Sequence, residues 1–233
     1  MRKIRLMTVV LLVALGLTLP INIVLAAGEN SNQQGESAGE LSAEWWQWVY
    51  SIPGVVNPVL DATGAYCAVG QCGDVWFLAG TFAGAAVRSC IIPEGKTLFF
   101  PVINNALFDS PNQCGQGPGS LGSVKDTRAQ AAAFIDSATK LSVTLDGKSV
   151  KQTQRIKSQV FEVSMPADNI YVYFNITPCD PGVYSPAVDD GYYALINPLG
   201  VGSHTLHIHA ESPLSGFVTD VTYNLTVVPV KLK

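Results

Sequence analysis

The sequence predicts a mainly β protein: an antiparallel β-sandwich, jelly-roll-like or Ig-like, with one or two short helices. Short runs of β-branched, aromatic and other apolar residues recur along the chain, and Gly, Pro, Asn and Asp turn signals separate them. The chain has 233 residues, of which 48% are hydrophobic and only 14% are charged, so it can bury a sizeable core. Many short strands around such a core are typical of a sandwich.

Residues 1–27 have the pattern of an export signal. A basic head, Met1–Arg5, precedes an apolar run over 6–19, and small residues at Ala26 and Ala27 provide a cleavage site. We expect cleavage after Ala26 or Ala27. The alternative is an uncleaved anchor, but the apolar run is interrupted and no charged stop-transfer flank follows it. The mature protein is therefore expected to be secreted, periplasmic or at the cell surface, with no membrane span after signal removal.

The mature chain divides into a flexible leader, residues 28–40, and a single β-rich domain, residues 41–233. The leader is polar and rich in Gly, Ser and Gln, which disfavours a packed structure. Removal of the signal takes away three basic residues and no acid, and it leaves a net charge of −7. Nucleic acids and anionic membranes reward basic patches, so neither is an expected partner.

Two helices are expected. The first runs from Ser42 to a stop at 53–54, with Trp45 and Trp48 on its buried stripe. The second begins at the capping-box pattern over 123–126 and runs to about Ala138.

About ten short strands complete the expected fold. They cover residues 75–81, 86–92, 97–103, 141–145, 149–153, 160–164, 171–175, 192–196, 204–210 and 217–228. Pro101 marks an edge or a bulge in the third of them. Asp189-Asp190-Gly191 is interpreted as a turn.

Five cysteines lie in the mature chain, and export would place them where disulfides form. An odd number leaves one cysteine free or bridged to another chain. Their spacing matches no redox or zinc motif and leaves the connectivity open. They are Cys67, Cys72, Cys90, Cys114 and Cys179.

A candidate metal site lies on one predicted strand. His207, His209 and Glu211 alternate along the sequence, so their side chains share one face of the strand. Two imidazoles and a carboxylate could bind a divalent metal such as zinc, copper or iron, if a further ligand came from elsewhere. The alternative is a polar strand face that points outward to water.

A candidate ligand-binding feature is the cluster Trp45-Trp46-Gln47-Trp48. Trp46 would point away from the buried stripe of the helix, so its ring could stack on a glycan or dock a protein partner. Trp45 and Trp48 are the other candidate ligand-binding residues, and they share the buried stripe. The structural alternative is that all of these rings pack the helix against a sheet.

No motif names a catalytic activity. The chain lacks a G-x-S-x-G elbow, an H-E-x-x-H helix and a phosphate-binding loop, and its carboxylates cannot be paired from sequence. Asn175 and Asn224 each begin an Asn-x-Thr sequence, which matters only in a host that glycosylates.

Several long segments carry a likeness to other proteins: WWQWVYSIPGVVNPVLDATGAYCAVGQ, VWFLAGTF, IPEGKTLFFPVIN, SPAVDDGYYALINPL and GSHTLHI. From Trp45 to about Pro229, the chain resembles a family of secreted prokaryotic proteins of uncharacterised function. The resemblance implies export and a single β-rich domain, but no activity and no catalytic residue. It also implies a disulfide between Cys67 and Cys90, which leaves a second between Cys114 and Cys179 and makes Cys72 the odd cysteine.

The sequence therefore favours a secreted, non-catalytic β-sandwich. Such a protein would bind an extracellular glycan, protein or surface, or would take part in an extracellular assembly by self-association. One alternative is a secreted hydrolase or metal-dependent enzyme that uses the His207, His209 and Glu211 face. Another is a structural protein of the cell envelope. Only the site can decide among them, because fold does not fix function.

Overall fold

The structure is a computed structural model that describes residues 37–82 and 84–230. The predicted export signal, its cleavage site and the first nine residues of the predicted leader lie outside the described residues. None of the described helices is both long enough and apolar enough to cross a membrane.

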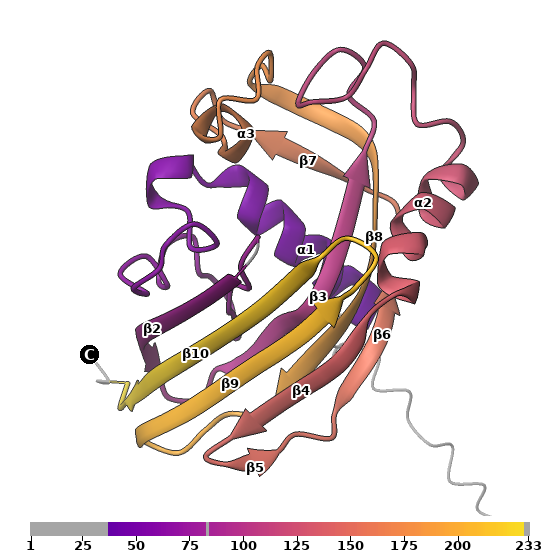
Figure 1. Ribbon diagram of the computed structural model, residues 1–233. Helices are drawn as coiled ribbons and strands as arrows, with labels where there is room; N and C mark the ends of the chain where they lie inside the picture. The colour runs from indigo at the N-terminus through magenta and orange to yellow at the C-terminus, as the bar shows by residue number, and fades with distance from the viewer. Residues whose placement is uncertain (1–36, 83, 231–233) are drawn as a thin grey trace, which may run out of the picture. The chain divides into compact units, whose positions relative to one another are not determined.

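Two five-stranded sheets form the framework of the described chain, and the fold is a β-sandwich with few short helices (Figure 1). Sheet A contains β1 (Val75–Phe77), β3 (Thr97–Phe108), β6 (Thr153–Lys157), β7 (Phe161–Met165) and β8 (Gly182–Ile196). Sheet B contains β2 (Gly84–Pro93), β4 (Thr139–Leu145), β5 (Lys148–Ser149), β9 (Gly202–Ser212) and β10 (Phe217–Val228). The helical elements are α1 (Ala38–Ser51), the 3-10 helix η1 (Gly54–Val56), α2 (Val124–Asp136) and α3 (Ile170–Tyr173).

The sheets are mixed rather than wholly antiparallel. β1 pairs with β3 in parallel, and β2 pairs with β10 in parallel, whereas the other pairs are antiparallel. The antiparallel expectation fails at these two pairs because β2 and β3, although joined by a short turn, belong to different sheets. β2 and β3 therefore do not form a hairpin with each other: β2 pairs with β10, and β3 pairs with β1 and β8.

Sheet A separates two hydrophobic cores. Successive side chains of a strand point to opposite faces, so β3 places Phe99 in a core with α1 and Phe100 in the core between the sheets. β8 does the same with Tyr193 and Ala194. α1 packs against sheet A through β3, β6, β7 and β8. The molecule thus has three layers over the described residues: α1, sheet A and sheet B.

α1 begins four residues earlier than the sequence suggested. Ser37 caps it: the backbone N of Glu40 donates to Ser37 Oγ at 3.3 Å, and the backbone N of Ser37 donates to Glu40 Oε2 at 2.7 Å. This reciprocal pair is a capping box, which lies in the segment taken as a flexible leader. The end of the expected leader, Ala38–Glu40, is therefore the first turn of a helix.

The second helix agrees with its expected start. Ser123 and Asp126 form the capping box at the beginning of α2, which ends at Asp136. The expected strand over 171–175 is wrong, because this segment belongs mostly to the short helix α3. Asn169 Oδ1 accepts hydrogen bonds from the backbone N–H groups of Tyr171, at 3.0 Å, and Val172, at 3.2 Å. Asn169 thus caps α3.

Seven of the expected strands form, most of them inside longer strands: 86–92, 97–103, 141–145, 160–164, 192–196, 204–210 and 217–228. The bulge expected at Pro101 is confirmed by a register shift between β3 and β8, although β3 lies inside sheet A and not at its edge. The expected strand over 149–153 does not form as one piece, because the chain leaves sheet B after β5 and enters sheet A at β6.

The first expected strand, 75–81, pairs only as far as Phe77. Side chains take the carbonyl groups that follow. Trp45 Nε1 donates to the carbonyl of Leu78 at 3.0 Å, and Arg88 donates to the next two carbonyls at 2.6 and 2.9 Å. Because the carbonyl groups of residues 78–80 are hydrogen-bonded to side chains, this segment does not continue the strand.

Asp189-Asp190-Gly191 is not a turn but the middle of β8. Both carboxylates are buried, on opposite faces of the strand. Asp190 receives two hydrogen bonds from Arg155, at 2.7 and 3.0 Å, and Asp189 receives hydrogen bonds from the α1 side. Because each acid has its own donors, the strand continues through a sequence that is typical of a turn.

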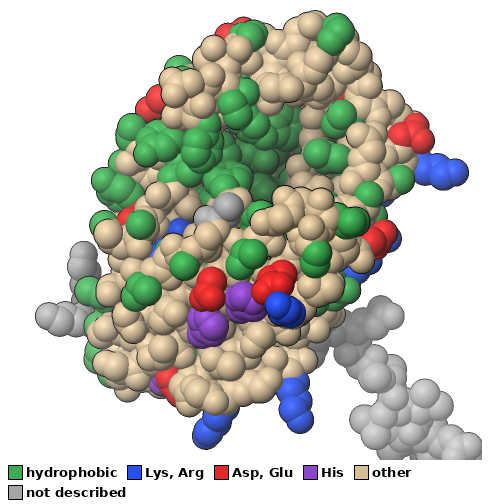
Figure 2. Space-filling view, in the orientation of Figure 1, with side chains coloured by type: hydrophobic (Ala, Val, Ile, Leu, Met, Phe, Trp, Pro, Cys, Tyr) green, Lys and Arg blue, Asp and Glu red, His purple; other side chains and the backbone are tan. Residues whose placement is uncertain are grey.

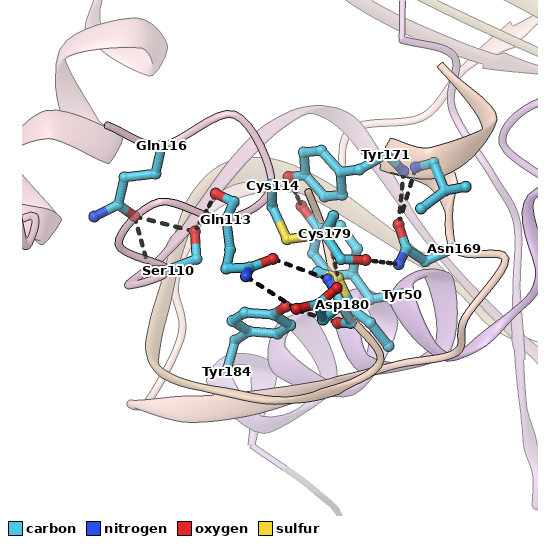
Figure 3. Close-up of a disulfide and its surroundings, with 12 residues drawn as sticks. Tyr50, Ser110, Gln113, Cys114, Gln116, Asn169, Tyr171, Cys179, Asp180 and Tyr184 are labelled. Carbon is cyan, nitrogen blue, oxygen red and sulfur yellow. Dashed lines mark hydrogen bonds between the residues drawn. A yellow bond between two sulfur atoms is a disulfide. The ribbon is translucent and has the colours of Figure 1, made fainter. Parts of the chain in front are cut away.

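Two disulfides link the described chain, and both pairings implied by the resemblance are confirmed. Cys67 bonds to Cys90, and Cys114 bonds to Cys179, whereas Cys72 is free and exposed. Figure 3 shows the second bond, where the backbone carbonyl of Cys179 accepts a hydrogen bond from the Asn169 side chain at 3.1 Å. This disulfide therefore holds the start of α3 against the loop that follows β3.

Candidate functional site

The three tryptophans of α1 are all buried. Each indole N–H has a partner: Trp45 donates to the carbonyl of Leu78, Trp46 donates to Asp189 Oδ1 at 2.8 Å, and Trp48 donates to the carbonyl of Val69 at 2.9 Å. None of the rings stands free on the surface as a stacking platform. Trp45 and Trp46 nevertheless line a cavity that opens to the surface, and Trp48 does not.

An apolar cleft lies beside α1. Figure 2 shows hydrophobic side chains gathered around a hollow, where Figure 1 shows α1 between α3 and β10. An outer pocket of about 450 Å³ and a more enclosed inner cavity of about 60 Å³ share three residues, Val59, Thr81 and Phe82. We call the outer pocket and the inner cavity together the cleft.

Aromatic side chains form the rim of the outer pocket. Phe82, Tyr173 and Phe174 are 41%, 51% and 48% exposed, respectively. The rings of Phe82 and Phe174 meet edge to face, with centroids 5.7 Å apart. Gly54 allows α3 to approach this closely, because a Cβ at that position would lie 2.6 Å from Tyr173 Cβ. The rim thus offers exposed rings that are held in place by packing.

A chain of hydrogen bonds leads from the inner cavity into the core. Asn104 lines the cavity, and its Nδ2 donates to the hydroxyl of Tyr193 at 2.9 Å. The Tyr193 hydroxyl donates to Asp189 Oδ2 at 2.9 Å, and Trp46 Nε1 occupies Asp189 Oδ1. We call Asn104, Tyr193, Asp189 and Trp46 the floor network.

Gly191 makes the floor network possible. It pairs with Asn104 across β8 and β3, and a Cβ on it would lie 2.6 Å from Asn104 Cβ and 2.8 Å from Tyr193 Cε2. Distances under 3.0 Å do not occur for real Cβ atoms without movement of the neighbours. A glycine at this position therefore lets Asn104 and Tyr193 come within hydrogen-bond distance.

Asp189 has an unusual protonation equilibrium. Its side chain is only 1% exposed, and this burial raises the pKa to about 8. Hydrogen bonds from Trp46 and Tyr193 act in the opposite direction, and the neighbouring charge of Asp190 raises the pKa further. At neutral pH, Asp189 is therefore mostly the uncharged acid.

Arg88 borders the outer pocket, but its side chain forms hydrogen bonds within the protein. Its guanidinium is buried and donates to the carbonyls of Val59, Asp61, Ala79 and Gly80 and to the hydroxyl of Tyr223. None of the ion pairs found within residues 37–82 and 84–230 includes Arg88. The side chain thus ties two loops to β2, and these loops form one wall of the cleft.

The predicted metal ligands lie together on the outer face of sheet B, where His209 Nε2 is 3.4 Å from Glu211 Oε1, and they also pair with other side chains. The Asp220 carboxylate on β10 lies 2.7 Å from His207 Nε2 and 3.3 Å from His209 Nδ1. The amine of Lys140 lies 3.0 Å from the Glu211 carboxylate. In the part of the chain that the structure describes, no group of three or more His, Cys, Asp or Glu residues is arranged to hold a metal ion. The geometry gives the metal prediction no support.

A second surface pocket, of about 600 Å³, lies where the chain passes from β5 in sheet B to β6 in sheet A. Its polar side chains include Asp146, Gln152, Gln154 and Asn197, and its described lining contains no aromatic ring. Leu145, Val150, Leu195 and Ile196 also line it, but because its described lining has no aromatic rim, we take the cleft beside α1 as the candidate site.

Sequence reasoning identified Trp45 and Trp46 but did not identify Asn104 or Tyr193. From the sequence, Asp189 is interpreted as part of a turn. The sequence does carry a signal that Asp189 is buried. Asp189 and Asp190 stand between two apolar runs, residues 187–188 and 192–196, which is typical of a buried strand with paired charges.

The fold and the cleft define a class of architecture: a β-sandwich with a helix on one sheet and an apolar, aromatic-rimmed cleft beside that helix. No family model matches the chain, and no curated protein is similar enough to it to count as a match. The resemblance to secreted prokaryotic proteins therefore stays a prediction.

Proposed function

We propose that this protein is a secreted, non-catalytic binding protein that takes a small, mostly apolar organic molecule into the cleft. The observation that carries the proposal is the cleft itself, in which exposed aromatic rings surround an apolar lining with few polar groups. Small-molecule sites have this composition, with a few polar groups that fix the orientation of the ligand.

The sizes of the two parts of the cleft suggest how a ligand would lie. The outer pocket, at about 450 Å³, is in the range of sites for small organic molecules. The inner cavity, at about 60 Å³, has room for a group no larger than about two water molecules. We infer that the apolar body of the ligand lies against Phe82, Tyr173 and Phe174, and that one small end group enters the inner cavity beside Asn104.

The lining of the cleft supports binding over catalysis. Of the described residues that line the inner cavity, none is titratable. In the outer pocket, the oxygens of Asp61 accept hydrogen bonds from Thr63 and Tyr66, and Arg88 is bound to backbone carbonyls. Asp189 is screened from the cavity by the side chains that contact it. Among the described residues that line the cleft, no imidazole, thiol or unpartnered carboxylate is therefore presented to a ligand.

Exposed aromatic rings also stack on sugars, which keeps a glycan as the second candidate ligand. A glycan site needs many hydrogen-bonding groups as well, because a sugar carries several hydroxyls. Apart from the two indoles, the polar side chains in the described lining of the inner cavity are those of Thr81 and Asn104, and Thr81 already bonds to the backbone of Gly84. We therefore favour an apolar ligand.

Fluorescence titration of the mature protein with N-phenyl-1-naphthylamine, a neutral apolar probe, tests the proposal. We expect saturable binding at one site, and affinity about tenfold weaker in a Phe82→Ala/Phe174→Ala double variant, because two rim rings are lost. Leu214→Ala removes an exposed apolar side chain elsewhere and is the matched control, with unchanged affinity. Absence of saturable probe binding, or binding only on a glycan array, would refute the apolar-ligand proposal.

The export signal supports the proposed location, and the two disulfides fit an oxidising compartment. Mass spectrometry of the protein from the native host's medium, periplasm and cell surface tests it. We expect a mature N-terminus at Ala27 or Gly28. Full-length chain found only inside the cell would overturn the proposal.

A further inference from the structure

We propose that Asn104 is the polar recognition group of the cleft, and that Tyr193 and Asp189 determine which arm of its amide a ligand meets. The inference rests on the proposed function, since it names the kind of end group that the inner cavity selects. Asn104 would contact the ligand, whereas Tyr193 and Asp189 would act as positioning residues.

Asn104 is placed to contact a ligand group that enters the inner cavity. It lines the inner cavity from β3, is only partly buried, and its Nδ2 is held by the hydroxyl of Tyr193. Thr81 is the other polar side chain in the described lining of this cavity that has a hydroxyl or amide, and it bonds to Thr219 and to the backbone of Gly84. An end group in the cavity therefore meets the free arm of the Asn104 amide.

The direction of the hydrogen-bond chain depends on one proton. When Asp189 is ionised it can only accept, so Tyr193 donates to it and the Tyr193 oxygen accepts from Asn104 Nδ2. The amide then turns its carbonyl oxygen to the cavity. When Asp189 carries a proton it can donate to the Tyr193 oxygen, and Tyr193 then donates to Asn104 Oδ1. A half-turn of the amide satisfies this arrangement and turns its NH₂ to the cavity.

The surroundings of Asp189 favour the protonated arrangement at neutral pH. Burial raises the pKa of Asp189 to about 8. The titratable or charged groups that interact with it are Tyr193 on β8, Tyr50 on α1, and Asp190 on the opposite face of β8, whose charge is bound by Arg155. The other groups that face it are neutral: Trp46 and Ser42 on α1, and Ser158, whose Oγ accepts from the Asp189 backbone N at 2.8 Å.

The ligand class follows from this polarity. With the NH₂ of Asn104 in the cavity, the site selects an apolar molecule that ends in a hydrogen-bond acceptor, such as a ketone, ester or ether oxygen. Above the pKa of Asp189, the same site would prefer an end group that donates. An amide left without its partner inside the bound complex penalises the wrong ligand, which makes a single group selective.

Displacement of N-phenyl-1-naphthylamine tests the inference with three probes: acetophenone, which only accepts; indole, which only donates; and cumene, which does neither. At about pH 6 we expect acetophenone to bind about fivefold more tightly than cumene, the size of one hydrogen bond. The affinity ratio of acetophenone to indole should fall between about pH 6 and about pH 10, as Asp189 loses its proton.

Three variants and one matched control separate recognition from general packing. Asn104→Leu should remove the preference for acetophenone over cumene, whereas Asn105→Leu, whose side chain bonds to α2 instead, should keep it. Asp189→Asn can donate to Tyr193 at every pH, so its acetophenone-to-indole ratio should no longer depend on pH. Tyr193→Phe breaks the chain and should also abolish the pH dependence, with folding checked by circular dichroism.

A readout without ligand keeps the inference separate from the proposed function. In labelled protein, the side-chain NH₂ signals of Asn104 should shift with the same midpoint pH as the carboxyl carbon of Asp189, and Tyr193→Phe should uncouple them. A preference for acetophenone that survives in Asn104→Leu, or an Asn104 signal that does not follow Asp189, would overturn the inference, whether or not the apolar probe binds. Failure of probe binding with intact coupling would refute only the proposed function.

Discussion

Two buried ionisable side chains are stabilised in different ways. Asp189 is taken out of water and becomes neutral, because burial penalises its charged form. Arg88 is buried as well, but it lies among backbone carbonyls that accept its N–H groups, and its guanidinium carbon lies 5.6 Å from the centre of the Tyr223 ring. At this scale, a buried group is satisfied by protonation in one case and by local dipoles in the other.

The first prediction concerns Asp189 and pH. The folded pKa of about 8 lies above the ordinary value of 3.8, so the folded state binds one more proton than the unfolded state between these values. The free energy of unfolding contributed by Asp189 is therefore full below about pH 4 and is lost as pH rises to about 8, at up to about 1.4 kcal/mol per pH unit. We expect Asp189→Asn to flatten this decline in urea denaturation measured across that range. An unchanged slope in the variant would contradict the assignment.

The second prediction concerns Arg88. Arg88→Met leaves buried carbonyls without a donor, so we expect the free energy of unfolding to fall by about 3 kcal/mol or more. Lys151→Met removes a cation from an exposed position and should change it by no more than about 0.5 kcal/mol. Urea denaturation measures both, and equal effects of the two variants would argue against a structural role for Arg88.

At the scale of elements, β8 is the strand on which the layers depend. It pairs with β3, β6 and β7, it contributes to both hydrophobic cores, and it carries Asp189, Asp190 and Gly191 in its middle. The strand tolerates this sequence because each acid has donors on its own face. Its glycine is required by neighbouring side chains and not by a turn.

The third prediction compares two glycines of β8. Gly191→Ala places a Cβ against Asn104 and Tyr193, so we expect a loss of about 1–3 kcal/mol in the free energy of unfolding. Gly182→Ala on the same strand meets no atom within 4 Å and should be close to neutral. Thermal unfolding measures both variants. A neutral Gly191→Ala would show that β3 and β8 can separate more easily than the packing suggests.

The sequence predicted elements well where local signals agree with the final packing. The second helix is predicted because Ser123 and Asp126 form its capping box, and most strands are predicted from short apolar runs between turn residues. The turn expected at 189–191 failed because local turn chemistry is overridden by partners distant in sequence, such as Trp46. The floor network could not be predicted for the same reason, since Asn104 and Tyr193 meet only after β3 pairs with β8.

At the scale of the whole molecule, each disulfide belongs to one hydrophobic core. Cys67 and Cys90 lie in the core between the sheets, and Cys114 and Cys179 lie in the core beside α1. The second bond joins residues 65 apart in sequence and the first joins residues 23 apart. Each bond therefore constrains a different layer of the molecule.

The fourth prediction concerns these bonds. In the loop-entropy description, removal of a bond costs about 3.5 kcal/mol for the shorter loop and about 4 kcal/mol for the longer loop. We expect a Cys114→Ser/Cys179→Ser variant to be destabilised at least as strongly as a Cys67→Ser/Cys90→Ser variant, by guanidinium denaturation without reductant. In the native protein, thiol titration should detect Cys72 alone. A reversed order of stability would show that native packing, not chain closure, dominates.

The separation of the two cores by sheet A has a consequence for how this protein can change over generations. Substitutions at well-separated sites usually add without interaction, so cleft residues other than Ala86 and Phe217, which pack into the core between the sheets, can be exchanged while that packing is preserved. Homologues with different side chains around the inner cavity could then keep one scaffold and acquire different ligands. Sequence variation in such a lineage would concentrate at the rim and at the position of Asn104, while the alternating residues between the sheets would drift slowly.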